Sequence, residues 1–142
     1  MRNTKINNKL TISQQLSNCF KFIPVITLSR SSDRVLYGIY VLSIDCEISS
    51  PYYPLQFVVW QTTTNGVTTQ LNVASSNGKY NGSTISNPAL TIYNIVYTDS
   101  GSYLCYAANV IGIGHSSLYL LSVEASKSVW NDLIPHNYQA VW

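Results

Sequence analysis

Apolar residues recur at every second position in short segments throughout the middle of the chain. In the clearest segment, the apolar members of the alternation are Tyr40, Leu42, Ile44 and Cys46. Such alternation is typical of a strand with one buried face. The opposite phase of this strand, which we expect to face water, contains Ser43, Asp45 and Glu47.

Four more segments favour strands, and turn signals separate them. The segments are 57–60, 90–95, 103–107 and 119–123. The turn signals are Asn65-Gly66, Asn77-Gly78, Asn81-Gly82, Asn87-Pro88 and the stretch 112–114. No long segment keeps a helical period. Many short strands at close spacing predict an all-β sandwich or barrel.

Length, charge and hydropathy restrict the class of protein. The 142 residues allow one domain with flanking segments. Only 10% of residues are charged and the net charge is +2 without runs of like charge, so we expect no nucleic-acid partner. No apolar stretch reaches the roughly 20 residues of a membrane span. Residues 1–28 lack a signal-peptide pattern, so an extracellular protein would be represented here by a fragment.

No catalytic or metal-binding pattern stands out. His115 and His136 show no spacing to Asp, Ser or Cys that would indicate a triad or a metal site. The glycines at 112 and 114 are followed by neither a helix pattern nor a lysine, so they indicate a hairpin turn and not a phosphate site. We therefore expect a protein that is not an enzyme, without cofactor, metal or small-molecule substrate.

Two cysteines and a tryptophan follow a recognisable order. Cys46 and Cys105 lie 59 positions apart on inward phases of separate strands, with Trp60 between them. The second cysteine ends the run Asp99-x-Gly101-x-Tyr103-x-Cys105. This combination resembles the immunoglobulin superfamily, in particular its intermediate-set and variable-like domains, which occur in invertebrate adhesion and matrix proteins.

The resemblance implies a fold and several structural roles. It implies a two-sheet antiparallel sandwich over residues 24–124, with irregular extensions at 1–23 and 125–142. It also implies a disulfide between Cys46 and Cys105, with Trp60 packed on it and Tyr103 forming a tyrosine corner. Lys79 stands where the family often carries an arginine that pairs with the aspartate matching Asp99.

The strand phases also predict a binding surface. If Trp60 and Cys105 face the core, alternation turns one set of residues outward on the predicted strands around 57–60, 103–107 and 119–123. That set is Phe57, Val59, Gln61, Leu104, Tyr106, Leu118 and Leu120. An apolar strip of this kind normally marks a partner site. The alternative is that the C-terminal tail, with its two tryptophans, or a neighbouring domain covers it.

Two function classes remain open. One is an extracellular recognition or cell-adhesion module that binds a protein, itself or another, through this face or through the end loops. The other is a spacer repeat of a matrix protein or of a reduced, cytoplasmic muscle-type protein. Asn81-Gly82-Ser83 is a candidate glycosylation site. Cys19 lies outside the expected domain as a left-over thiol.

Overall fold

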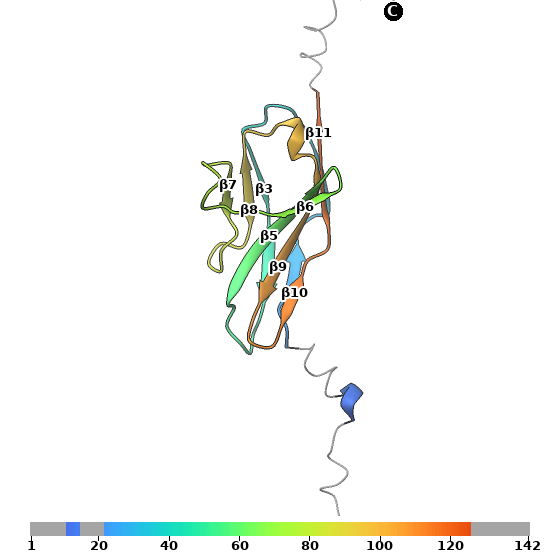
Figure 1. The fold of residues 1–142 in the computed structure, drawn as a ribbon, viewed down its shortest axis with the longest axis vertical. Coiled ribbons are helices and arrows are strands. Elements are labelled where there is room, and N and C mark those ends of the chain that lie inside the picture. Colours follow the sequence, from blue (N-terminus) through green and yellow to red (C-terminus); the bar gives the residue numbers. More distant parts are fainter. Residues whose placement is uncertain (1–10, 15–21, 126–142) are drawn as a thin grey trace, which may run out of the picture.

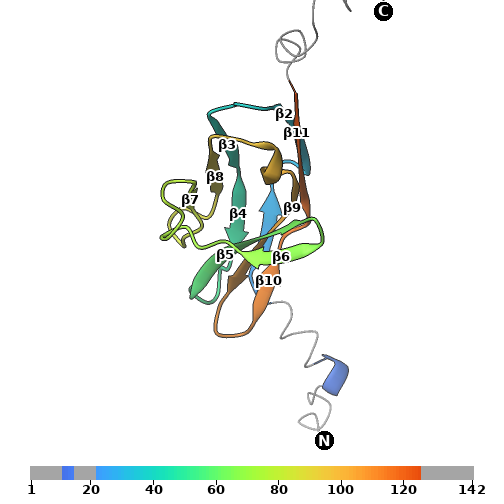
Figure 2. The ribbon, with the colours of Figure 1, turned by 45° about the horizontal axis from the view of Figure 1, so that its top comes forward.

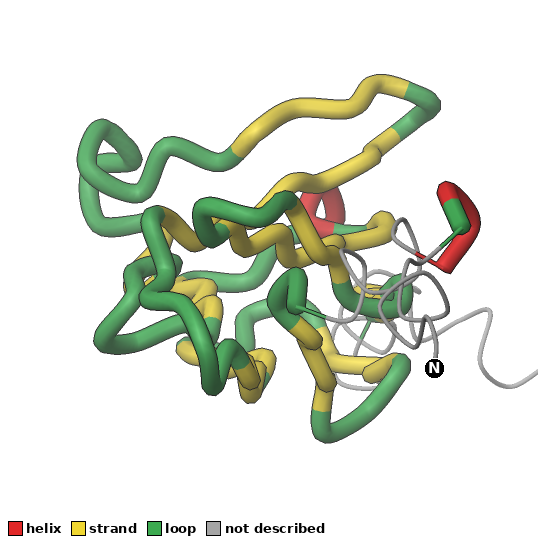
Figure 3. The backbone as a smooth tube through the Cα atoms, turned by 90° about the horizontal axis from the view of Figure 1, so that it is seen from below, coloured by secondary structure: helices red, strands yellow, loops and turns green. Residues whose placement is uncertain are grey.

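The computed structural model describes residues 11–14 and 22–125, and its strands form the body of the molecule in Figure 1. The strands are β1 (Val25–Leu28), β2 (Ser32–Leu36), β3 (Val41–Ile44), β4 (Cys46–Ser49), β5 (Phe57–Thr64), β6 (Val67–Gln70), β7 (Tyr80–Gly82), β8 (Leu90–Tyr93), β9 (Gly101–Ala108), β10 (Ile113–His115) and β11 (Tyr119–Glu124). Within the described residues, helical backbone is confined to the 3-10 helix η1 (Tyr97–Asp99) and a turn at 12–14 (Figure 3). The predicted all-β class is confirmed.

The strands form two layers. One layer holds β1 paired with β4 and the three-stranded sheet β3-β8-β7. The other is a six-stranded sheet in the order β2-β11-β9-β5-β6, with β10 also paired to β9. All pairs are antiparallel except β2 with β11. Figure 2 shows the layers facing each other, as an immunoglobulin-like sandwich requires.

The chain crosses from one layer to the other between β1 and β2. β1 pairs with β4, whereas β2 pairs with β11 in the opposite layer. Arg30 lies at the crossing, where its guanidinium contacts the Asp33 carboxylate and donates a hydrogen bond to the Ser43 carbonyl at 2.6 Å. The Tyr119 hydroxyl also donates to Asp33. These four residues tie both layers to the crossing point.

The core follows the predicted phases with one correction. The inward residues of β8, β9 and β11 are buried as expected, and Trp60 is fully buried between the layers. The prediction was wrong for Tyr40, which is 68% exposed. β3 begins only at Val41, so Tyr40 lies in the preceding connection, where its ring packs edge-on against Tyr93 at 5.9 Å between centroids.

Two of the predicted turns have a different structure. Asn65-Gly66 does form the β5–β6 hairpin turn, with φ values of 51° and 77° that suit a type I′ turn. Asn81-Gly82 instead lies in β7, because this short segment pairs with β8. Ile113 and Gly114, in the predicted turn at 112–114, instead lie in β10, paired with Ala108 and Ala107.

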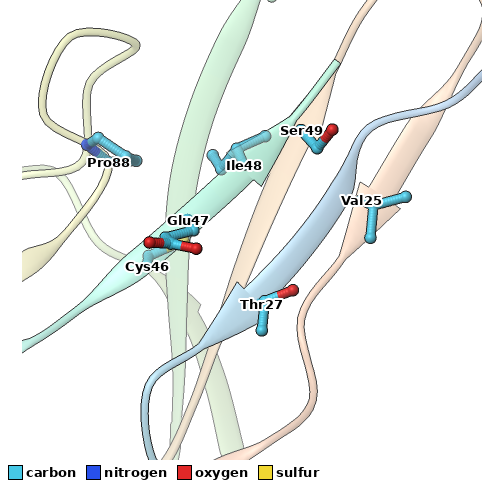
Figure 4. Close-up of a pocket in the computed structure, with 7 residues that line it drawn as sticks. All are labelled: Val25, Thr27, Cys46, Glu47, Ile48, Ser49 and Pro88. Carbon is cyan, nitrogen blue, oxygen red and sulfur yellow. The ribbon is translucent and has the colours of Figure 1, made fainter. Parts of the chain in front are cut away.

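Pairing with β8 continues along β3 but stops before β4. β3 pairs with β8 as far as Ile44 and Leu90, and the same register would place Cys46 opposite Pro88. Proline has no N–H to continue the ladder. Figure 4 shows Pro88 on a separate loop, across a surface hollow of about 370 Å³ from β4. β4 therefore pairs with β1 alone.

Candidate functional site

Cys46 and Cys105 meet in the centre of the sandwich. Their sulfur atoms lie 3.5 Å apart, and both residues are buried. A disulfide bond is about 2.05 Å long, so the structure has two thiols in contact and the bond stays a prediction. Trp60 is opposite Cys105 in the β5–β9 register, and its indole N–H donates to the Pro88 carbonyl at 2.8 Å.

The motif that ends at Cys105 forms a polar cluster where η1 leads into β9. The Tyr103 hydroxyl donates to the Asp99 carbonyl at 2.7 Å, which is the expected tyrosine corner. The buried Asp99 carboxylate accepts from Lys79 at 2.7 Å and from the Val96 N–H at 2.8 Å. Burial raises the pKa of Tyr103, because ionisation would place a charge in the core. Lys79 thus occupies the predicted position of the family's arginine.

Gly101 is required by a close backbone approach. A Cβ atom at this position would lie 2.5 Å from the carbonyl oxygen of Thr63 on the neighbouring strand. No real Cβ tolerates that distance, and the obstacle is backbone, which cannot rotate away. The glycine of the motif therefore lets β9 begin directly against β5.

The predicted binding residues lie together on the outer face of the six-stranded sheet. Phe57 of β5 and Ile113 of β10 lie opposite Ala108 of β9 on either side. In the next row Val59 and His115 both lie opposite Tyr106, and the Tyr106 and His115 ring centroids are 6.0 Å apart. The register therefore places the side chains of three strands on one surface.

Leu118 and Leu120 extend this surface toward β11. Each is 55% exposed, compared with 40% for Phe57 and 59% for Ile113. Gln61 lies opposite Leu104 and is its polar member. We define the apolar strip as Phe57, Val59, Leu104, Tyr106, Ile113, Leu118 and Leu120. Sequence reasoning missed Ile113, because it assigned residues 112–114 to a turn.

Asn109 shapes the turn between β9 and β10. It is buried, and its side-chain oxygen accepts the N–H groups of Ile111 and Gly112 at 2.9 and 3.2 Å. Its side-chain nitrogen donates to the Phe22 carbonyl at 2.7 Å and to the Ser50 hydroxyl at 3.0 Å. One amide thus fixes the turn that precedes Ile113.

Comparison with known proteins agrees with this geometry. No family model matches the chain. Human "Cell adhesion molecule DSCAM" is 31% identical over 87 residues, which are 61% of this chain and 4% of that protein. Mouse "Neural cell adhesion molecule 1" is 31% identical over 84 residues, 56% of the chain and 7% of that protein. "Fibroblast growth factor receptor" of Ciona intestinalis is 40% identical over 50 residues, 34% of the chain and 7% of that protein.

The resemblance inferred from the cysteine and tryptophan order is therefore confirmed. The domain has an immunoglobulin-like fold and is similar to these cell-adhesion and receptor proteins. The chain spans well under a tenth of the length of these relatives.

The apolar strip of this immunoglobulin-like domain is electrically neutral. It contains no Asp, Glu, Lys or Arg. The ion pairs of the described residues lie elsewhere: Arg30 with Asp33, Arg34 with Glu124 and Lys79 with Asp99. A partner can thus cover the strip without removing a charge from water.

The outer face of the opposite layer differs in character. Asp45 and Glu47 are exposed there, as predicted, but Val25 and Val41 are also exposed, at 60% and 48%. That face is therefore mixed, and not uniformly polar as the alternation suggested. Asn81 lies on it, opposite Thr91. Ser43, Thr91 and Tyr93 are half-buried.

The described part of the chain offers no obvious site for other chemistry. Among residues 11–14 and 22–125, no three His, Cys, Asp or Glu side chains gather as metal ligands. No helix in these ranges is long and apolar enough to cross a membrane. Cys19 and His136 lie outside the described residues.

Proposed function

We propose that this immunoglobulin domain is an extracellular recognition module of a cell-adhesion protein, which binds a protein partner through the apolar strip. The observation that carries the proposal is the neutral row of exposed and half-buried apolar side chains across β5, β9, β10 and β11. Protein interfaces have such apolar, charge-poor centres. Two of the relatives are named as cell adhesion molecules.

An extracellular location is supported by two further features. The sulfurs of Cys46 and Cys105 face each other at 3.5 Å, as the partners of a disulfide would, and disulfides persist in oxidising compartments. Asn81 is exposed on the layer opposite the strip. A glycan at Asn81 would therefore leave the strip accessible.

Self-association is the first form of binding to test. Sedimentation velocity over a concentration series would detect strong self-association. Aggregation of beads coated with the chain would detect weak self-association, because many weak contacts act together between two beads. The variant Leu118→Lys places a charge in the strip. Ser49→Lys is the matched control, since Ser49 is exposed on β4 in the other layer.

We expect association that Leu118→Lys abolishes and Ser49→Lys leaves intact. Association lost equally in both variants would contradict a role for the strip. If neither assay detects association, the homophilic form fails, and binding must then be sought with a different protein.

A spacer role is the second candidate. The observation that favours it is that β1 begins at one end of the sandwich and β11 ends at the other (Figure 1), as in a repeat joined end to end. A spacer needs no free strip. The result that would favour the spacer role is that Leu118→Lys leaves the binding of the intact parent protein to its partners unchanged in every assay.

A further inference from the structure

A second exposed apolar surface lies at the end of the domain where β11 finishes. The β2–β3 connection and η1 meet there, as Figure 2 shows. Their exposed side chains, with the exposed fraction of each residue, are Leu36 (48%), Tyr37 (44%), Ile39 (40%), Tyr40 (68%) and Tyr97 (47%). We call these five residues the aromatic end. None of them carries a charge.

The aromatic end is held in one conformation. The rings of Tyr37 and Tyr97 stack with centroids 4.6 Å apart and planes 21° from parallel. The Tyr37 N–H donates to the Glu124 carbonyl at 2.7 Å, and the Ile39 carbonyl accepts the Ile95 N–H at 2.9 Å. A surface built this way does not have to be ordered when something binds to it, which favours binding.

The chain leaves the fold beside this surface. Glu124, the last residue of β11, is opposite Leu36 in the parallel β2–β11 register. The sequence that follows Ala125 contains Val129, Trp130, Leu133 and Ile134. Trp130 is five positions after Ala125, and a chain of that length spans up to about 17 Å. Trp130 is thus within reach of Tyr37 and Tyr97.

The apolar strip is a poorer match for the same segment. Ile113, in β10, lies at the opposite end of the sandwich from the end of β11 (Figure 1). A segment covering the strip would have to reverse direction along the whole domain. The aromatic end needs only a turn after residue 125.

We propose that residues 126–134 of this chain dock on the aromatic end, with the indole of Trp130 packed against the stacked rings of Tyr37 and Tyr97. Aromatic pairs in contact are favourable beyond the area that they bury. The contact stiffens the junction between the domain and whatever follows it. It leaves the apolar strip open, and it does not depend on the function proposed above.

Fluorine NMR of the full chain labelled with 5-fluorotryptophan tests this proposal. The variant Trp142→Phe leaves two signals, from Trp60 and Trp130, and Trp130→Phe assigns them. The H2O-to-D2O isotope shift of each signal measures its exposure to solvent. The double variant Tyr37→Ser/Tyr97→Ser removes the docking rings, and Tyr52→Ser is the control, because Tyr52 is 67% exposed near Phe22 at the other end.

We expect a Trp130 signal with a reduced isotope shift, which rises to that of a free indole in the double variant and stays reduced in Tyr52→Ser. The Trp60 signal, from a fully buried side chain, must remain unchanged in both variants and so reports that the domain is folded. A Trp130 signal with the isotope shift of a free indole in the parent chain would overturn the proposal. So would protection that disappears on dilution, which would indicate a second copy as the occupant.

Discussion

At the scale of single residues, each position of the motif from Asp99 to Cys105 meets a local physical requirement. Asp99 is buried with its charge, so it needs the Lys79 ammonium and the Val96 N–H. Tyr103 is buried with its hydroxyl, so it needs the Asp99 carbonyl. Gly101 is required because a Cβ atom would meet Thr63. Each position follows from burial and space.

Removing the Tyr103 hydroxyl tests the second of these requirements. We expect Tyr103→Phe to lower the free energy of unfolding by about 1 kcal/mol, because one buried hydrogen bond is lost while the ring remains packed. Urea unfolding would measure this loss. Tyr52→Phe, on an exposed ring, should change the free energy by much less, and an equal change in both variants would contradict the argument.

The buried tyrosines also predict a pH dependence. Burial is the largest cause that raises the pKa of both Tyr103 and Tyr119, so each keeps its proton in the folded state at pH values where the unfolded chain loses it. Stability is therefore complete below the ordinary tyrosine pKa of about 10 and falls as pH rises above it. The expected slope is about 1.4 kcal/mol per pH unit for each such tyrosine.

Unfolding in urea from about pH 9 to pH 11.5 would measure this slope, an interval chosen around the ordinary tyrosine pKa. In Tyr103→Phe the slope should be shallower by the share of one tyrosine. An unchanged slope would show that Tyr103 ionises equally in both states.

At the scale of elements, sequence reasoning succeeded where a strand has one buried face. The phases of β8, β9 and β11 could be predicted because alternating apolar residues point inward. β2 could not, since Ser32–Leu36 carries no such alternation and its place depends on Arg30, Asp33 and Tyr119. The aromatic end was missed for a related reason: Tyr40 continues the alternation of β3 in the sequence but lies outside the strand.

Loss of the crossing contacts should loosen β2. In Asp33→Asn the carboxylate that binds both Arg30 and Tyr119 is gone, so we expect a loss of about 1.5 to 3 kcal/mol in unfolding free energy, the range for hydrogen bonds to charged groups. Amide hydrogen exchange should accelerate in β2. Arg34→Gln is the control, because its ion pair with Glu124 is largely exposed and such pairs contribute little. Equal losses of unfolding free energy in Asp33→Asn and Arg34→Gln would contradict the proposal that Asp33 holds β2 in place.

At the scale of the whole molecule, the sequence could predict which residues form the apolar strip, but not whether a partner binds there. Alternation placed Phe57, Val59 and Tyr106 outward, and the register confirms that they share a surface. Binding at that surface would depend on shape complementarity with a partner, which the sequence of one chain does not contain. The same limit applies to Cys46 and Cys105, since their bond depends on the redox environment.

The disulfide proposal has a direct test. In chain refolded under oxidising conditions and then denatured, we expect one reactive thiol, from Cys19, and none in Cys19→Ser. Reduction should lower the free energy of unfolding by about 4 kcal/mol, because the bond would close a loop of about 60 residues in the unfolded chain. Three reactive thiols in the refolded chain would instead support the reduced, cytoplasmic alternative.

The parallel pairing of β2 with β11 has a mechanical consequence. β11 ends where the chain leaves the domain, and β2 follows β1, which begins at the opposite end, where the chain enters (Figure 1). Tension between the flanking segments pulls β2 one way and β11 the other. Five register pairs, from Leu120 with Ser32 to Glu124 with Leu36, then bear the load together in shear. The domain should therefore resist stretching until these pairs rupture at once.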